Sequence, residues 1–284
     1  MRRGVALVTG SASGFGRHAC ASLVARGYRV YASMRDPSRG EAVLADVAAR
    51  GFSPEDVELV ALDVDDPDAV ADLADRIHAR HGALDVLVNN AGVAAAGFAE
   101  EFDEAELRRL LDTNFLAVVR LTQRFAPSMR ERRSGRIVNV SSIGGRVATP
   151  GHAGYHASKF ALEGWSEALH HELRPFHVFV SLIEPGLFPT GIFAANYRKI
   201  GPGVAGRGPY ARLAAKLDEA SARASRRLAW ADPRDVGELV AKVAIAEAPR
   251  LRYPIGVDAW ASTLLGPGLV GRAWEQAMLA WFRD

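Results

Sequence analysis

Short runs of β-branched and aliphatic residues alternate with longer helical patterns along most of this chain. Near-continuous apolar runs are typical of parallel strands buried on both faces of a sheet, and their alternation with helices indicates repeated strand–helix–strand units. Strands are predicted at residues 5–9, 29–33, 58–63, 86–89, 136–140, 179–183 and 253–255. Helices are predicted at residues 17–26, 67–81, 104–133, 155–173 and 233–247. The sequence therefore predicts an α/β fold with a doubly wound parallel sheet of about seven strands.

The 284 residues contain no internal repeat and no low-complexity linker, so we predict a single domain over residues 1–284. Residues 188–230 depart from the regular pattern because glycine–proline groups interrupt weaker helical stretches, and such segments tend to be lids or binding loops. The tail, residues 257–284, places Trp274, Met278, Trp281 and Phe282 at helical spacing. A packed amphipathic tail is the favoured interpretation, with a dimer contact or a membrane-surface contact as the alternative.

Charge and composition exclude several classes of protein. The net charge is +2, from 35 basic and 33 acidic residues that are mixed along the chain, so no nucleic-acid partner is predicted. The single cysteine, Cys20, excludes an internal disulfide and is expected in the core. The apolar run after the N-terminus is too short for a signal peptide, and no stretch approaches a membrane span. We therefore expect a cytoplasmic location, no integral membrane segment and no metal site.

A glycine-rich segment, Thr9-Gly10-Ser11-Ala12-Ser13-Gly14-Phe15-Gly16, follows the first predicted strand and opens the first predicted helix. Glycines let the backbone turn tightly and approach a pyrophosphate, whose charge the helix N-terminus stabilises. The spacing is Gly-x-x-x-Gly-x-Gly, which differs from the general dinucleotide fingerprint. The strand–turn–helix context nevertheless predicts a dinucleotide site that uses Gly10, Ser11, Ser13, Gly14, Phe15 and Gly16.

The end of the second predicted strand indicates which dinucleotide is preferred. An acidic residue at this place binds the ribose 2′-hydroxyl of NAD, but the strand ends on Met34 and Arg35 follows. A guanidinium suits a 2′-phosphate through charge-assisted hydrogen bonds. We therefore predict that NADP(H) is preferred over NAD(H). The alternative is that a small shift in register lets Asp36 bind the hydroxyl of NAD(H).

Tyr155 and Lys159 are four residues apart in a strong helical pattern, so their side chains share one face. Tyrosine titrates near pH 10, and a neighbouring ammonium favours the phenolate and lowers that pKa. Such a pair can exchange a proton with an alcohol or carbonyl oxygen while a hydride moves at the carbon. The Tyr-x-x-x-Lys spacing alone is weak evidence, because it is common in helices.

Other polar residues strengthen this interpretation. Ser142 follows the fifth predicted strand, at the sheet edge where ligands bind in open α/β sheets, and can hydrogen-bond a substrate oxygen. Ser141 is the alternative for that role, since adjacent strand residues face opposite sides. Asn114 lies in an otherwise apolar helical stretch and needs buried partners; a water held there would link Lys159 to solvent. Asn90 follows the fourth predicted strand, where a structural role is as well supported as a cofactor contact.

These motifs, in this order from residue 5 to about residue 191, resemble the short-chain dehydrogenase/reductase family in its common branch of about 250 residues. The resemblance implies a Rossmann-type fold and a catalytic tetrad of Asn114, Ser142, Tyr155 and Lys159. It also implies that Lys159 holds the nicotinamide ribose. The further cofactor contacts that it implies are Asp63 and Val64 at the adenine, Asn90, Ala91 and Gly92 at the adenosine ribose, and Pro185, Gly186 and Thr190 at the nicotinamide.

Residues 30–36 and 158–164 are similar to the 17β-hydroxysteroid and retinol dehydrogenase group, which acts on lipophilic alcohols and ketones. The favoured function is an NADP(H)-dependent oxidoreductase that acts on a carbonyl or secondary alcohol of a lipophilic substrate, with a reductase of small or acyl-thioester ketones as the alternative. A non-catalytic dinucleotide sensor and an epimerase or dehydratase of the longer branch are disfavoured. The resemblance also implies a homodimer or homotetramer built on the helices at residues 104–133 and 155–173.

The expected substrate pocket is apolar and involves the lid. The residues that predict it are Phe188, Phe193, Tyr197 and Tyr210 in the lid and Val147 near the catalytic residues. His152 is a further candidate for substrate contact, but a histidine in a surface loop is the favoured interpretation.

Overall fold

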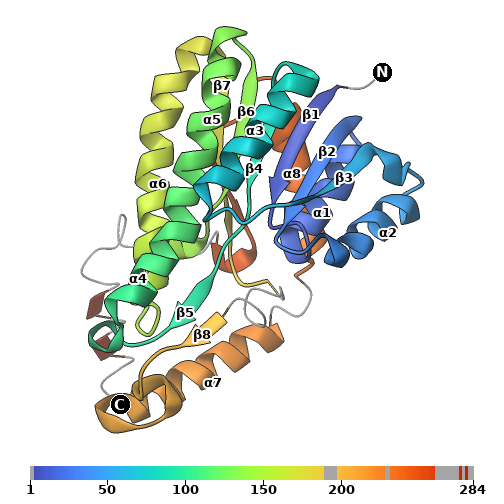
Figure 1. Ribbon diagram of the computed structural model, residues 1–284. Coiled ribbons are helices and arrows are strands. Elements are labelled where there is room, and N and C mark those ends of the chain that lie inside the picture. Colours follow the sequence, from blue (N-terminus) through green and yellow to red (C-terminus); the bar gives the residue numbers. More distant parts are fainter. Residues whose placement is uncertain (1–2, 189–196, 228–230, 260–274, 277–278, 281–284) are drawn as a thin grey trace.

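A computed structural model describes residues 3–188, 197–227, 231–259, 275–276 and 279–280 (Figure 1). The predicted residues Thr190, Phe193 and most of the aromatic tail lie outside these ranges. The strands are β1 (Gly4–Thr9), β2 (Tyr28–Met34), β3 (Val57–Ala61), β4 (Val86–Asn89), β5 (Ala94–Ala96), β6 (Gly135–Val140), β7 (Val178–Pro185), β8 (Tyr197–Lys199) and β9 (Arg252–Ile255). The α-helices are α1 (Gly14–Val24), α2 (Glu41–Ala49), α3 (Pro67–His81), α4 (Glu104–Leu111), α5 (Ala117–Glu131), α6 (Ala153–Leu173), α7 (Ala211–Arg227) and α8 (Pro233–Ile245).

Seven parallel strands form the central sheet in the order β3-β2-β1-β4-β6-β7-β9. The order reverses between β1 and β4, which makes their carboxyl ends the topological switch point where ligands bind in such sheets. The predicted Rossmann-type doubly wound sheet is therefore confirmed.

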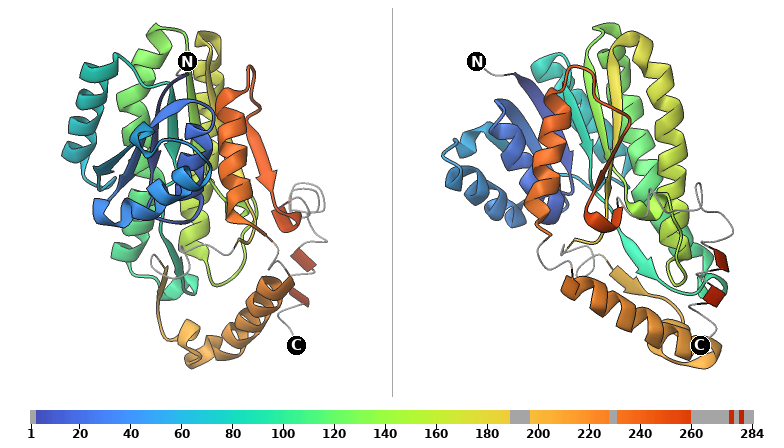
Figure 2. Two further views of the ribbon diagram at one scale, coloured as in Figure 1. Left: turned by 90° about the vertical axis from the view of Figure 1, so that its right-hand side faces the viewer. Right: turned by 180° about the vertical axis from the view of Figure 1, so that it is seen from behind.

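Helices cover both faces of this sheet, with α1, α2 and α8 on one face and α3, α5 and α6 on the other (Figures 1 and 2). Alternate residues of β1 enter the two cores: Ala6 and Val8 pack toward α1 and α8, while Val5 and Leu7 pack toward α3 and α5. This period of two is the reason why the strand is apolar throughout. Cys20 is fully buried, as predicted.

The predicted helix at residues 104–133 is wrong as a single element. A π-helical turn, Asp112–Leu116, separates α4 from α5. Such turns insert one extra residue and are frequent at functional sites. The Asp103 side chain caps α4 by accepting a hydrogen bond from the Glu106 N–H at 2.7 Å.

The lid region is more regular than the sequence predicts. β8 pairs with β5 in a separate two-stranded parallel sheet, and α7 follows it at the end of the molecule opposite the N-terminus (Figures 1 and 2). The ring of Tyr210 stacks on Phe98 with centroids 4.1 Å apart, which ties the start of α7 to the segment after β5. In the described part of the chain no helix has the length and apolarity to cross a membrane.

Candidate active site

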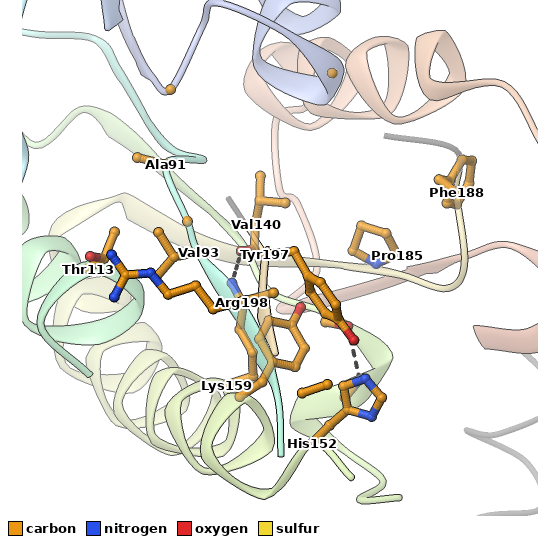
Figure 3. Close-up of a pocket in the computed structure, with 18 of the residues that line it drawn as sticks. Ala91, Val93, Thr113, Val140, His152, Lys159, Pro185, Phe188, Tyr197 and Arg198 are labelled. Carbon is orange, nitrogen blue, oxygen red and sulfur yellow. Dashed lines mark hydrogen bonds between the residues drawn. The ribbon is translucent and has the colours of Figure 1, made fainter. Parts of the chain in front are cut away.

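A cavity of about 1450 Å³ lies at the carboxyl edge of the central sheet (Figure 3). Its lining includes the glycine-rich loop, the ends of β2, β4, β6 and β7, the start of α6, and parts of β8 and α7. The volume exceeds the roughly 300–1,000 Å³ of a typical small-ligand site, which leaves room for a dinucleotide and a second molecule. One continuous cavity therefore joins most of the predicted cofactor and catalytic residues.

The glycine-rich loop has the geometry that a pyrophosphate needs. Gly10 and Gly14 have φ angles of +68° and +56°, a region that favours glycine. Ser13 precedes α1 without a side-chain cap among the described residues, so the first N–H groups of the helix face the cavity. The lining residues Gly10, Ser13, Gly14 and Phe15 therefore fit a phosphate-binding role, as predicted.

Two residues of the loop have a different role from the predicted one. The Ser11 hydroxyl donates to the Val8 carbonyl at 2.8 Å, and the side chain is fully buried away from the cavity. Gly16 also lies outside the lining, and a Cβ there would be 2.6 Å from the Gly10 carbonyl oxygen. Both residues lie on the side of the loop away from the cavity, because strand–helix packing leaves no room for them to face a ligand.

Asn90 connects the fourth strand to the glycine-rich loop. Its Nδ2 donates to the carbonyls of Thr9 and Gly10 at 2.8 and 3.1 Å, while the Thr9 hydroxyl accepts from the Asn90 and Ala91 N–H groups. The structural alternative for Asn90 is therefore supported. Asn90, Ala91 and Gly92 also line the cavity, as do Asp63 and Val64.

Arg35, Asp36 and Arg39 line the cavity beyond the end of β2. Asp36 caps a short 3₁₀ turn, Pro37–Gly40, by accepting from the Ser38 N–H and hydroxyl at 3.0 and 2.7 Å. These bonds lower the pKa of its exposed carboxyl. Arg39 is not among the cofactor contacts predicted from the sequence. Its position in the turn that follows Arg35 was the signal that could have indicated it. Two guanidinium groups therefore share this end of the cavity with a carboxylate that is engaged in a cap.

The four tetrad residues come together around the start of α6. Tyr155 and Lys159 of that helix line the cavity, as does Ser142 after β6; Figure 3 shows Lys159 there. The Lys159 Nζ donates to the Val140 carbonyl at 3.0 Å and lies 6.0 Å from the centre of the Tyr155 ring. Ser142 lies near enough to Tyr155 to lower the pKa of its phenol. The Ser142 Oγ also accepts from the Gly144 N–H at 3.0 Å, which leaves its own proton for donation.

Burial governs the protonation of this pair. It raises the pKa of Tyr155, and Ser142 partly offsets the shift. Burial also lowers the pKa of Lys159 to about 8, against the opposing charge of Glu163. The prediction that the Tyr155 pKa is lowered is therefore wrong for this geometry, because Lys159 is directed to the Val140 carbonyl and desolvation of the phenolate outweighs the effect of the ammonium.

Asn114 lies in the π-helical turn and is buried, with three side-chain hydrogen bonds. Its Oδ1 accepts from the Val93 N–H, and its Nδ2 donates to the Val93 carbonyl and to the Ser158 hydroxyl, each at 2.9 Å. Ser158 in turn donates to the Tyr155 carbonyl at 2.7 Å. The predicted need for buried partners is met by protein groups, so Asn114 fixes the backbone after β4 to the helix that carries Tyr155.

Ser141 has a different environment from Ser142. Both line the cavity, but the Ser141 hydroxyl is buried and has no partner among the described residues. Of the two, Ser142 is the one that acts on the pKa of Tyr155. The geometry therefore favours Ser142 for contact with a substrate oxygen.

The part of the cavity beyond the catalytic residues combines apolar and polar side chains. Val147, Phe188 and Tyr197 line it as predicted, and Pro185 and Gly186 complete the end of β7. Tyr210 does not line the cavity, because its ring is stacked on Phe98. Lining residues that the sequence did not indicate include the apolar Val93, Ala94, Ala96, Leu187, Val204 and Leu217 and the charged Arg109, Arg198, Lys199 and Asp218.

His152 is not in a surface loop, and that interpretation is wrong. It precedes α6 as the capping residue, lines the cavity, and has a pKa that burial lowers. The hydroxyl of Tyr197 points toward its ring (Figure 3). The alternative in which His152 faces the substrate is therefore the one that the geometry supports.

Comparison with known proteins agrees with this arrangement. Residues 4–200 match the family model described as short chain dehydrogenase. The chain belongs to the short-chain dehydrogenase family. It is therefore an oxidoreductase that acts on alcohol or ketone groups with a nicotinamide cofactor, and the predicted family and enzyme class are confirmed.

Within the family, the chain is similar to several named dehydrogenases and reductases. It is 34% identical to a 3-ketodihydrosphingosine reductase from Bacteroides thetaiotaomicron, with 90% of this chain and 89% of that protein covered. It is 38% identical to estradiol 17-beta-dehydrogenase 1 from Rattus norvegicus, with 88% and 72% covered. A short-chain dehydrogenase from Streptomyces avermitilis matches with a TM-score of 0.80 at 33% identity, over 100% of this chain and 99% of that one. A metagenomic short-chain oxidoreductase solved with NADP matches with a TM-score of 0.69 at 29% identity, over 90% and 97%.

Proposed function

We propose that this dehydrogenase is NADP(H)-dependent and interconverts a carbonyl and a secondary alcohol on a bulky, lipophilic substrate. Tyr155 is the acid and base, Ser142 binds the reacting oxygen, Lys159 supports the tyrosine and Asn114 holds the site together. The observation that carries the proposal is that Ser142, Tyr155 and Lys159 line the same cavity as the glycine-rich loop, with Ser142 near enough to Tyr155 to lower its pKa.

The chemistry follows from the protonation of these groups. A bound nicotinamide supplies or accepts the hydride at the substrate carbon. In the reducing direction, Tyr155 donates its phenolic proton to the carbonyl oxygen, and the Ser142 hydroxyl donates a hydrogen bond to the same oxygen. The raised pKa of Tyr155 keeps that proton in place at neutral pH. The Lys159 ammonium lies on the face of α6 where it stabilises the phenolate that remains, and it would also bind the nicotinamide ribose.

The preference for NADP(H) rests on the end of β2. Arg35 and Arg39 border the cavity where the adenosine ribose would lie, and guanidinium groups bind phosphate through charge-assisted hydrogen bonds. Asp36, the alternative ligand for an NAD ribose, is engaged as a cap. The relative solved with NADP has the same fold.

The substrate class rests on the apolar lining residues Val147, Phe188 and Val204. Two of the relatives are named for 3-ketodihydrosphingosine and for estradiol. Buried apolar area stabilises a bound substrate by about 25 cal/mol per Å². Large apolar ketones are therefore favoured over small polar ones.

A homodimer or homotetramer is part of the proposal. Leu116 in the π-helical turn and Phe160 on α6 are 41% and 45% exposed on the helices that the sequence predicts at an interface. Exposed apolar side chains on these elements favour contact with another copy. Size-exclusion chromatography with light scattering measures the state.

Tyr155→Phe tests the function. With NADPH and a series of ketones of increasing size, the variant should lose about 10²-fold or more in kcat, because the proton donor is absent. NADPH binding should stay within about twofold of the native value, because the substitution removes only the hydroxyl group of Tyr155 and keeps its ring. Tyr28→Phe, which alters a buried tyrosine remote from the cavity, is the control. Retained turnover in Tyr155→Phe, or equal native rates on small polar and large apolar ketones, would contradict the respective part of the proposal.

A further inference from the structure

His156 follows Tyr155 on α6 but faces a different part of the molecule. Successive residues of an α-helix point about 100° apart, so the His156 side chain leaves the helix in a different direction from Tyr155, although both residues line the cavity. The His156 ring is buried, with 8% of the residue exposed, and it lies against the loop that runs from Ser142 to Thr149. This loop contains Ser142 at one end and the cavity-lining Val147 near the other.

Both ring nitrogens of His156 bind this loop. The Thr149 N–H is 3.1 Å from Nε2 and can only donate, so Nε2 accepts. Nδ1 therefore carries the proton and donates to the Gly144 carbonyl at 2.8 Å. The Thr149 hydroxyl lies 3.1 Å from Nε2 as well. One neutral tautomer satisfies all of these contacts.

Gly144 is held from two sides. Its carbonyl accepts from His156, and its N–H donates to the Ser142 Oγ at 3.0 Å. A Cβ on Gly144 would lie 2.9 Å from the His156 Nδ1 and 3.2 Å from Cε1 of Tyr155, so the imidazole and the phenol ring both pack on this residue. The position of the Ser142 hydroxyl is thus connected to His156 through a single residue.

We infer that His156 is a positioning residue that, as a neutral imidazole, fixes the 142–149 loop so that Ser142 meets Tyr155 and the substrate oxygen. The inference rests on the proposed function, because it takes Ser142 and Tyr155 as the groups that contact that oxygen. Both ring nitrogens of His156 are engaged by the loop, so the residue acts on Ser142 through Gly144.

The ring must be neutral to do this. Protonation of Nε2 would place an N–H donor against the Thr149 N–H, and the contact would be lost. Burial lowers the His156 pKa below its ordinary 6.5, which keeps the ring neutral at physiological pH, while the bond to the Gly144 carbonyl opposes that shift. The neighbouring titratable rings are His152 and Tyr155, with centroids 6.1 and 6.0 Å away.

The test compares two substitutions in the full-length enzyme with NADPH and a ketone that it reduces. His156→Phe keeps a ring and removes both hydrogen bonds, so kcat should fall by about 10- to 100-fold, as for other groups that orient a reacting residue. His156→Asn keeps a donor for the Gly144 carbonyl and should retain at least about a third of the native kcat. His171→Asn, an exposed histidine on the same helix, is the control.

The pH profile separates positioning from general stability. Native kcat should fall as the pH drops through the His156 pKa, and His156→Asn should lack this acid limb. NADPH affinity, measured by fluorescence titration, should stay within about twofold in both variants. A kcat within threefold of native in His156→Phe, an equal loss in both variants, or an unchanged acid limb in His156→Asn would overturn the inference. If His156→Phe does not fold, the asparagine variant decides alone, and a tenfold loss there overturns it. Failure of the proposed function is distinguishable, because Tyr155→Phe would then retain turnover.

Discussion

Replacing Asn114 with leucine removes three hydrogen bonds while it keeps the side chain close to its original size. The N–H and carbonyl of Val93 lose their Asn114 partners, and the Ser158 hydroxyl keeps only its bond to the Tyr155 carbonyl. A buried polar group without a partner costs about 1–3 kcal/mol. Val93 is half-buried, so its two backbone groups should together cost about 2–4 kcal/mol.

Thermal unfolding measures this cost directly. For a chain of this size, 1 kcal/mol corresponds to about 2–4 °C in Tm. The leucine variant should therefore melt about 4–16 °C below the native protein. Turnover should fall as well, because the Val93 backbone borders the cavity and Ser158 connects to Tyr155.

Ser158→Ala is the matched control, since it removes one of the three bonds and leaves both bonds to Val93. It should cost about 1 kcal/mol and lower Tm by about 2–4 °C. If Asn114→Leu melts within 2 °C of the native protein, the three bonds do not hold the site together, and the assignment of Asn114 as a structural clamp is refuted.

Two further predictions concern charge. Arg35→Ala should raise the KM for NADPH about tenfold or more, because a charge-assisted phosphate contact is lost, with little change for NADH; equal changes for both cofactors would contradict the NADP(H) preference. Glu184 is fully buried beside Arg146 and Arg252, and burial together with the charge of Glu163 raises its pKa to about 7. The folded state thus binds its proton more tightly than the unfolded state, so stability should fall as pH rises from about 4.5 to 7. Glu184→Gln should flatten this part of the profile in urea unfolding at pH 5 and pH 8, and an unchanged slope would refute the assignment.

The central sheet could be predicted from the sequence because its strands are buried on both faces. Residues such as Val5 to Val8 alternate between two apolar cores, so every position in the strand had to be apolar. The short helix α2 lacks such a signal, since only Val43 and Val47 are buried along its nine residues. A single pair at i and i+4 does not distinguish a helix from a loop.

The lid sheet could not be predicted, for a different reason. β5 is a run of three alanines, a residue that is depleted in strands, and it pairs with residues about 100 positions further along the chain. Side-chain direction was also out of reach in the glycine-rich loop. The sequence placed Ser11 in the loop correctly, but its hydroxyl turns back to the Val8 carbonyl, and only the packing of β1 against α1 decides that.

Packing that the sequence does not show also explains why the prediction of a lowered Tyr155 pKa is wrong. The four-residue spacing of Tyr155 and Lys159 established that they share a helical face, and proximity to an ammonium implied a lowered tyrosine pKa. Burial instead disfavours both charged forms, the phenolate of Tyr155 and the ammonium of Lys159. It is the largest effect on the pKa of each group. Tyr155 therefore enters the reaction as a phenol, ready to donate a proton to a carbonyl. In the oxidising direction it must first lose that proton, and the groups that favour this loss are the Ser142 hydroxyl and the Lys159 charge. Because the Lys159 pKa is about 8, its charge declines over the same alkaline range in which a phenolate becomes accessible.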